Sequence, residues 1–168
     1  MKRILIVAAA VLALAGCQQK TKTAEPGGPA QQSEVSKTFM AKIGKETGVT
    51  VLPSGLAYKV VRAGPASGLK PGPKDEVKVH YEGKLEDGTV FDSSYERGAP
   101  AAMPLDRLIP AWQEALQLMR PGDEWLLYVP SNLGYGEEGA GQIPPGAPLI
   151  FRIELIDVLA APGRIQQG

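Results

Sequence analysis

The most constraining stretch of this chain runs from residue 77 to residue 94 and combines a strand, a tight turn and a second strand. In its first arm, Val77, Val79, Tyr81 and Leu85 alternate with polar residues, which is the period-two pattern of a half-buried strand. Glu86-Asp87-Gly88 provides the turn, because glycine adopts positive φ without a steric penalty. The stretch therefore predicts a β-hairpin. Adjacent strand residues point to opposite faces, so Phe91 and Asp92 can share a pocket only if the second arm ends or bulges there.

The N-terminus has the features of an export signal. Lys2 and Arg3 precede an apolar run, Ile4 to Ala15, that is short for a membrane-spanning helix. The sequence around Cys17, Leu-Ala-Gly-Cys, resembles the lipobox of bacterial lipoproteins. That resemblance implies a signal peptide over 1–16, a lipidated Cys17 and a protein anchored in the cell envelope. Gln18 replaces the aspartate of inner-membrane signals, which favours the outer membrane, facing the periplasm, if the source has two membranes.

The residues between this signal and the folded part divide into a tether and a helix. Residues 17–32 contain no large apolar side chain, so we expect a flexible tether. Cys17 is the only cysteine of the chain, which excludes an internal disulfide. Within 33–48, Ser33 is a candidate N-cap, and apolar residues at 35, 39, 40 and 43 recur at helical spacing. This pattern predicts a short amphipathic helix, which either packs against the domain or mediates self-association.

Residues 49–160 predict a single α+β domain. Short alternating strands begin near Leu56, near Trp125 and at Leu149, and one helix is expected over 108–119, with Pro110 in its first turn. Trp112, Ala115, Leu116 and Met119 form its apolar stripe. We expect an antiparallel, twisted β-sheet wrapped around this helix, with a groove edged by loops at 95–104 and 130–148. Residues 161–168 are expected to form a flexible tail.

Most chemistries lack the residues that they need. The 18 basic and 18 acidic residues balance, and no basic face indicates nucleic-acid binding. His80 is the only histidine and falls on the polar face of its strand, so neither a zinc site nor a Ser-His-Asp triad is expected. The glycines at 134–141 do not match a phosphate-binding loop. What remains is a set of aromatic residues that either pack in the core or converge on the groove.

Several motifs together resemble the FKBP-type peptidyl-prolyl cis-trans isomerases. The resemblance covers roughly 49–158 and its bacterial branch includes the macrophage infectivity potentiator proteins. The motifs are the 79–94 segment, Leu108-Ile109-Pro110 with Trp112, Tyr128 to Pro130 with Leu133-Gly134-Tyr135-Gly136, and Ile143-Pro144-Pro145 through Phe151. By this resemblance the catalytic residues are Phe91, Asp92 and Tyr135. The substrate-binding residues it implies are Tyr81, Phe91, Asp92, Arg97, Met103, Leu108, Ile109, Trp112, Tyr135, Ile143 and Phe151.

The resemblance also implies an activity and its partners. It implies non-covalent rotation about bonds preceding proline, without metal or cofactor, in unfolded or partly folded exported polypeptides, and binding of macrolides of the FK506 and rapamycin type. The Tyr135 hydroxyl and the Ile143 backbone would hold the peptide. Two positions depart from many relatives, namely Ala101-Ala102-Met103, where an aromatic ring is common, and Ala111 in place of glycine. One alternative is a chaperone or peptide-binding module that uses the same groove with little or no turnover. Another is an assembly or adhesion lipoprotein whose partner surface is the helix at 33–46.

Overall fold

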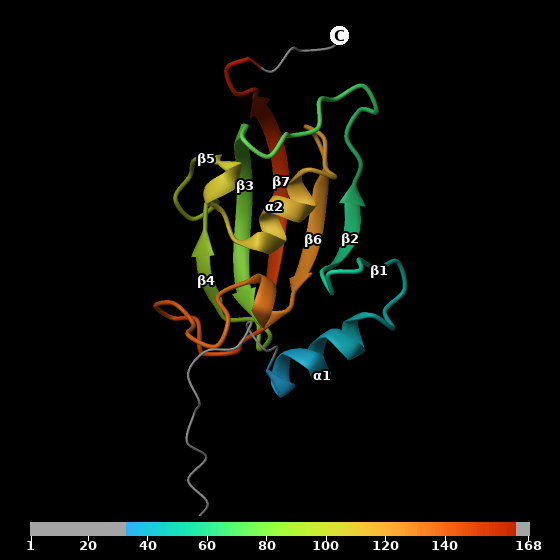
Figure 1. Cartoon of the computed structure of the whole chain (residues 1–168), viewed down its shortest axis with the longest axis vertical. Coiled ribbons are helices and arrows are strands. Elements are labelled where there is room, and N and C mark those ends of the chain that lie inside the picture. The colour runs from blue at the N-terminus through green and yellow to red at the C-terminus, as the bar shows by residue number, and fades with distance from the viewer. Residues whose placement is uncertain (1–32, 164–168) are drawn as a thin grey trace, which may run out of the picture.

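The computed structural model describes residues 33–163, which form a seven-stranded antiparallel sheet with a helix packed on each face (Figure 1). The predicted signal peptide, Cys17, the tether and residues 164–168 of the tail lie outside the described residues. No helix within the described part is long and apolar enough to cross a membrane. The elements in chain order are α1 (Glu34–Ile43), β1 (Thr50–Val51), β2 (Ala57–Arg62), β3 (Glu76–Leu85), β4 (Val90–Ser93), β5 (Ala101–Pro104), η1 (Leu105–Arg107), α2 (Pro110–Leu116), β6 (Glu124–Val129), η2 (Ser131–Leu133) and β7 (Leu149–Leu159).

The sheet is built around the long pair β3 and β7. Their antiparallel register runs from Glu76 opposite Leu159 to Leu85 opposite Leu149, and the strand order is β1-β2-β6-β7-β3-β4, with β5 also paired to β3. This arrangement confirms the predicted α+β class. Alternate residues of the strands face α2 and are buried, which places the main core between the helix and the sheet. The strand residues of this core include Val77, Val79, Leu127, Val129, Leu149, Phe151, Ile153 and Leu155.

Helix α2 confirms the predicted apolar stripe. Pro110 occupies its first turn, where the missing N–H leaves no hydrogen bond unmade. Trp112 is 5% exposed, and Ala115, Leu116 and Met119 are fully buried. The helix is shorter than expected, because Leu108 and Ile109 are extended and the chain leaves the helix after Leu116.

The predicted hairpin is confirmed as β3 and β4, including its irregularity. Gly88 has a φ of 89°, as the Asp-Gly turn requires. Gly83 pairs with Asp92, whereas Lys84 pairs with Val90, so Phe91 is an extra residue on β4. This β-bulge lets Phe91 and Asp92, which are adjacent in the sequence, both line the cavity described below.

Helix α1 packs on the sheet face opposite α2. Ser33 caps it as expected, accepting a hydrogen bond from the Ser36 N–H at 3.1 Å. Ile43 is buried against Ala57 and Tyr128. The predicted apolar face is only partly correct, because Val35 is 54% exposed while the polar Ser36 is fully buried. Packing against the domain is thus one role of this helix, and self-association stays a prediction.

The prediction of a loop at 95–104 was wrong for its last four residues. Residues Ala101–Pro104 form β5, which pairs with β3 from Val79 opposite Ala101 to Glu76 opposite Pro104. Short strand β4 leaves this end of the β3 edge unpaired, and β5 occupies it. Pro104 is tolerated because it ends an edge strand, where it need not donate to the ladder.

Candidate functional site

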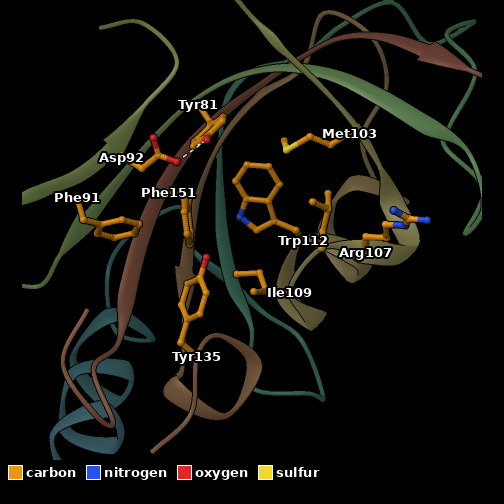
Figure 2. A pocket seen from close by; sticks show the side chains of 10 residues that line it. Tyr81, Phe91, Asp92, Met103, Arg107, Ile109, Trp112, Tyr135 and Phe151 are labelled. Atoms are coloured by element: carbon orange, nitrogen blue, oxygen red, sulfur yellow. Dashed lines mark hydrogen bonds between the residues drawn. The ribbon is translucent and has the colours of Figure 1, made fainter. Parts of the chain in front are cut away.

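A cavity of about 230 Å³ lies between α2 and the sheet. Tyr135 of the 130–148 loop lines it, in agreement with the predicted groove, whereas Met103 lines it from strand β5 and not from a loop. All predicted substrate-binding residues line the cavity except Arg97 and Ile143, and one unpredicted residue, Arg107, joins them. The full lining is Tyr81, Phe91, Asp92, Met103, Arg107, Leu108, Ile109, Trp112, Tyr135 and Phe151 (Figure 2).

Trp112 forms the floor of the cavity at the N-terminal part of α2. Its indole meets the Tyr81 ring edge-to-face at 5.1 Å between centroids and the Phe151 ring at 5.3 Å. Figure 2 shows the indole between Tyr81, Phe151 and Met103. Its Nε1 is buried and has no hydrogen-bond partner among the described residues. Because these rings hold each other at angles near 90°, the floor and walls form one rigid apolar surface.

The Phe91 wall depends on the absence of a side chain at Gly83. Phe91 meets Phe151 edge-to-face at 5.7 Å between centroids. A Cβ placed on Gly83 would lie 2.6 Å from the Phe91 Cζ and 2.9 Å from the Phe151 Cε1. The bulge in β4 therefore directs the Phe91 ring over β3, and Gly83 leaves the space that the ring occupies.

A polar cluster stands beside this apolar wall. The Tyr81 hydroxyl donates to Asp92 Oδ2 at 2.5 Å, and Arg97 forms an ion pair with Asp92 Oδ1. Arg97 Nη2 also donates to the Tyr81 hydroxyl at 2.8 Å, and its guanidinium lies 5.4 Å from the centre of the Tyr81 ring. Arg97 thus reaches the site by holding Asp92 and Tyr81 in place.

The electrostatics of the cluster keep Asp92 ionised. Burial acts to raise the pKa of Asp92, but the hydrogen bonds from Tyr81 and Arg97 and the charge of Arg97 outweigh it, and the pKa is lowered. The pKa of Tyr81 is raised, first by burial and then by its hydrogen bond to Asp92. At neutral pH the cavity therefore contains a carboxylate, which accepts hydrogen bonds only, and a neutral phenol.

Tyr135 brings a hydroxyl to the cavity from the other side. Its side chain is 39% exposed, and Figure 2 shows the hydroxyl directed toward the cavity beside Phe151. Burial, and then the negative charge of Asp92, raise the pKa of Tyr135, so its phenol also stays protonated. No hydrogen bond engages this hydroxyl among the described residues, which leaves it available as a donor to a ligand.

Besides Arg97, which acts through Asp92 and Tyr81, Ile143 and Arg107 differ from the predicted site. Ile143 is buried in the core near the cavity without lining it, and its N–H and C=O both pair with Ala140. Its backbone is therefore hydrogen-bonded within the loop, and the contact of the Ile143 backbone with a peptide stays a prediction. Arg107 reaches the rim because η1 ends there, and a single turn of this kind has no periodic pattern in the sequence.

The arrangement suits binding of a compact apolar ring. Within residues 33–163, no three His, Cys, Asp or Glu side chains are grouped to hold a metal ion. His80 lies on the solvent side of β3, where its Nδ1 is 2.9 Å from the Ser94 hydroxyl and its ring stacks on Tyr95. The cavity thus offers aromatic walls, one fixed carboxylate and one free phenol donor, and no nucleophile paired with a base.

Comparisons with known proteins match two family models to the chain. A model described as FKBP-type peptidyl-prolyl cis-trans isomerase matches residues 68–156, and one described as the domain amino terminal to it matches residues 6–60. The peptidyl-prolyl cis-trans isomerase Mip of Coxiella burnetii is 51% identical over 127 residues, which are 75% of this chain and 54% of that protein. The outer membrane protein MIP of Legionella longbeachae is 48% identical over 73% of this chain and 52% of its own length. The chain thus spans about half the length of these curated relatives.

Solved structures show the same architecture. The crystal structure of FkpA from Escherichia coli superimposes with a TM-score of 0.72 at 43% identity, covering 76% of this chain and 59% of that one. The crystal structure of a peptidyl-prolyl cis-trans isomerase from Pseudomonas syringae pv. tomato gives a TM-score of 0.71 at 38% identity, covering 82% of this chain and all of that one.

Proposed function

Because this chain belongs to the FKBP-type peptidyl-prolyl cis-trans isomerases, we propose that its cavity catalyses rotation about the bond preceding proline in peptides. The observation that carries the proposal is the aromatic enclosure. A floor of Trp112 and walls of Phe91 and Phe151 surround a space that fits an apolar ring, beside a phenol that can donate a hydrogen bond.

Such a site needs no nucleophile for this reaction. Rotation about the peptide bond destroys amide resonance and meets a barrier of about 18–20 kcal/mol. Uncatalysed exchange therefore takes about tens to hundreds of seconds. In the twisted amide the carbonyl dipole is weaker, so transfer from water into a dry apolar cavity favours the twisted form over the planar one. An acceleration of about 10⁶ would require roughly 8 kcal/mol of this differential stabilisation.

The residues take distinct roles in this proposal. The proline ring lies on Trp112, and the Tyr135 hydroxyl donates to a peptide carbonyl. Asp92 is ionised and accepts from Tyr81 and Arg97, so it contributes a fixed negative field and orders the Tyr81 wall. Met103, Leu108 and Ile109 line the remaining apolar side and contact the residue next to proline.

The test is cis/trans exchange of an Ala-Leu-Pro-Phe peptide, measured by NMR with the purified full chain. We expect the chain to accelerate exchange, and Phe91→Ala and Asp92→Ala to reduce kcat/KM. The control is Lys78→Ala, an exposed residue on the opposite face of β3. A wild-type chain that does not accelerate exchange refutes the enzyme proposal. If it still binds the peptide and suppresses client aggregation, the groove is a chaperone or binding module.

We further propose that the chain is a lipoprotein of the cell envelope that acts on exported polypeptides and binds FK506- or rapamycin-type macrolides. The Leu-Ala-Gly-Cys sequence ending at Cys17 supports the anchor, and a Legionella relative is named an outer membrane protein. Expression in a bacterium with labelled palmitate should label the wild-type chain and leave Cys17→Ser unlabelled. A soluble, unlabelled wild-type protein would contradict the anchor. Macrolide binding is measured by competition with the peptide.

A further inference from the structure

Helix α1 is hydrogen-bonded to the loop that carries Tyr135, although the two are about a hundred residues apart in the sequence. The Ser36 hydroxyl accepts from the Ser131 N–H at 2.9 Å, and both residues are fully buried. The Ser33 N–H donates to the Ser131 hydroxyl at 3.2 Å, and the Ser33 hydroxyl donates to the Gly146 carbonyl. Figure 1 shows α1 directly beside the start of this loop after β6. The helix therefore holds the loop near both of its ends.

Ser131 passes this restraint to Tyr135. Its carbonyl accepts from the Gly134 N–H at 3.1 Å and from the Gly136 N–H at 2.8 Å, so both neighbours of Tyr135 are fixed to one oxygen. Gly146 connects the other end of the loop to the same segment, because its N–H donates to the Gly136 carbonyl at 2.8 Å. The backbone on each side of Tyr135 is thus tied to residues that α1 holds.

The restraint matters because the connection from Pro130 to Pro148 is long and has little regular structure. Outside η2 it forms one isolated bridge, between Ala140 and Ile143. A long loop has many conformations to lose when it presents a side chain to a ligand. The buried hydrogen bond from the Ser131 N–H to Ser36 restricts the loop before a ligand binds, so less conformational entropy is lost on binding. Breaking this bond is unfavourable, because it would leave a buried N–H unpaired.

We propose that α1 is a positioning element of the site, in which Ser33 and Ser36 fix the Tyr135 hydroxyl at the cavity through Ser131. The proposal rests on the proposed isomerase function and deepens it. It assigns a part in the site to α1, the helix at the start of the described residues. Because Tyr135 would hold the planar and twisted peptide alike, loss of the restraint should raise KM and leave kcat nearly unchanged.

The first test is Ser36→Ala in the full chain, with Thr38→Ala as the control. The Thr38 hydroxyl is exposed and donates within α1 to the Glu34 carbonyl, so its loss does not touch the loop. We expect Ser36→Ala to raise KM for the peptide about fivefold with kcat within about twofold, and to speed amide exchange of Gly134 and Gly136 about fivefold or more, the effect of one lost hydrogen bond. Thr38→Ala should change neither. Unchanged amide exchange at 134 and 136 would overturn the proposal, whether or not the chain proves to be an isomerase.

A double-mutant cycle separates positioning from a general loss of stability. In a Tyr135→Phe background the hydroxyl is absent, so adding Ser36→Ala should have little further effect on KM. A fivefold rise that persists in this background would overturn the proposal. In the same way, Ser33→Thr, which keeps the hydroxyl, should retain the wild-type KM that Ser33→Ala loses.

Gly146 tests the same contact from the loop side if Ser36→Ala does not fold. A Cβ on Gly146 would lie 2.7 Å from the Ser33 Cβ, whereas a Cβ on Gly141 meets nothing within 4 Å. Both glycines have positive φ, 69° and 54°, so alanine strains the backbone at each. We expect Gly146→Ala to raise KM and amide exchange at 134 and 136 well beyond Gly141→Ala. Equal effects of the two variants would overturn the proposal.

Discussion

Replacing Gly83 by alanine should displace two walls of the cavity, although Gly83 itself does not line it. Gly83 has no positive φ, so alanine is compatible with its backbone. Its added methyl group would nevertheless stand 2.6 and 2.7 Å from the Cζ and Cε2 of Phe91 and 2.9 Å from the Cε1 of Phe151. The perturbation is therefore purely steric and is directed at two walls of the site.

The size of the effect follows from these distances. Carbon atoms in contact lie about 3.5–4.0 Å apart, so the Phe91 ring must retreat by about 1 Å. Overpacking of this kind costs about 1–3 kcal/mol of unfolding free energy. A displacement of about 1 Å in a reacting geometry can cost about 100-fold in rate. We expect kcat/KM of Gly83→Ala to fall about 10- to 100-fold, with a folded protein remaining.

The assay is NMR exchange of the prolyl peptide combined with urea unfolding. Gly44→Ala is the matched control, because Gly44 also lacks positive φ and a Cβ there would meet its nearest atoms at 3.4 and 3.5 Å. A second variant, Gly83→Ala with Phe91→Leu, removes the ring atoms that clash. It should recover stability but not activity, since the aromatic wall is lost. Wild-type kcat/KM and unshifted Phe91 ring signals in Gly83→Ala would refute the steric argument.

Three further predictions concern the polar groups. Because the pKa of Asp92 is lowered in the folded chain, its stabilisation is present above the unfolded carboxyl pKa of about 3.9 and is lost as pH falls through the lower folded value. The difference in unfolding free energy between wild type and Asp92→Asn should thus be constant near neutral pH and shrink in acid; a difference that grows in acid would contradict this sign. Tyr81→Phe removes a hydrogen bond that favours the charged carboxylate, so NMR titration should show the pKa of Asp92 rising. Asp123→Ala removes the acceptor of the Gly64 and Arg120 N–H groups and should cost about 1–3 kcal/mol per unpaired group in urea unfolding, with the cavity signals unchanged.

The features that the sequence predicted well are those fixed by local chemistry. Alternation and the Asp-Gly turn define the β3–β4 hairpin, and helical spacing with Pro110 at the start defines α2. Strand geometry also required an irregularity at Phe91-Asp92 if both side chains were to share a pocket, and β4 has a bulge there. Placement of the aromatic rings around one cavity came instead from the resemblance to a family, because periodicity alone cannot distinguish a core ring from a wall.

The features that were missed are fixed by distant parts of the chain. Ala101-Ala102-Met103 has no strand pattern of its own, and it becomes β5 because β3 offers an unpaired edge. Arg107 reaches the cavity through a single turn that follows β5. In α1 the hydrophobic pattern selects Val35 for the interface, yet Ser36 is the buried residue. A buried serine there satisfies the Ser131 N–H, and a hydropathy pattern contains no information about that donor.

The site, like the features that were missed, depends on contacts between distant parts of the chain. The Phe91 wall of the cavity arises where the regular sheet is interrupted, namely at the bulge that adds Phe91 and at Gly83 opposite Asp92. Regular strands would direct Phe91 and Asp92 to opposite faces and would place a side chain where the Phe91 ring now lies. Each interruption gives up ladder or packing energy, so its neighbours must restrain it for the site to be well ordered. Edge-to-face packing of the rings and the Tyr81–Asp92–Arg97 cluster supply that restraint on one side of the cavity, and on our proposal α1 supplies it on the other.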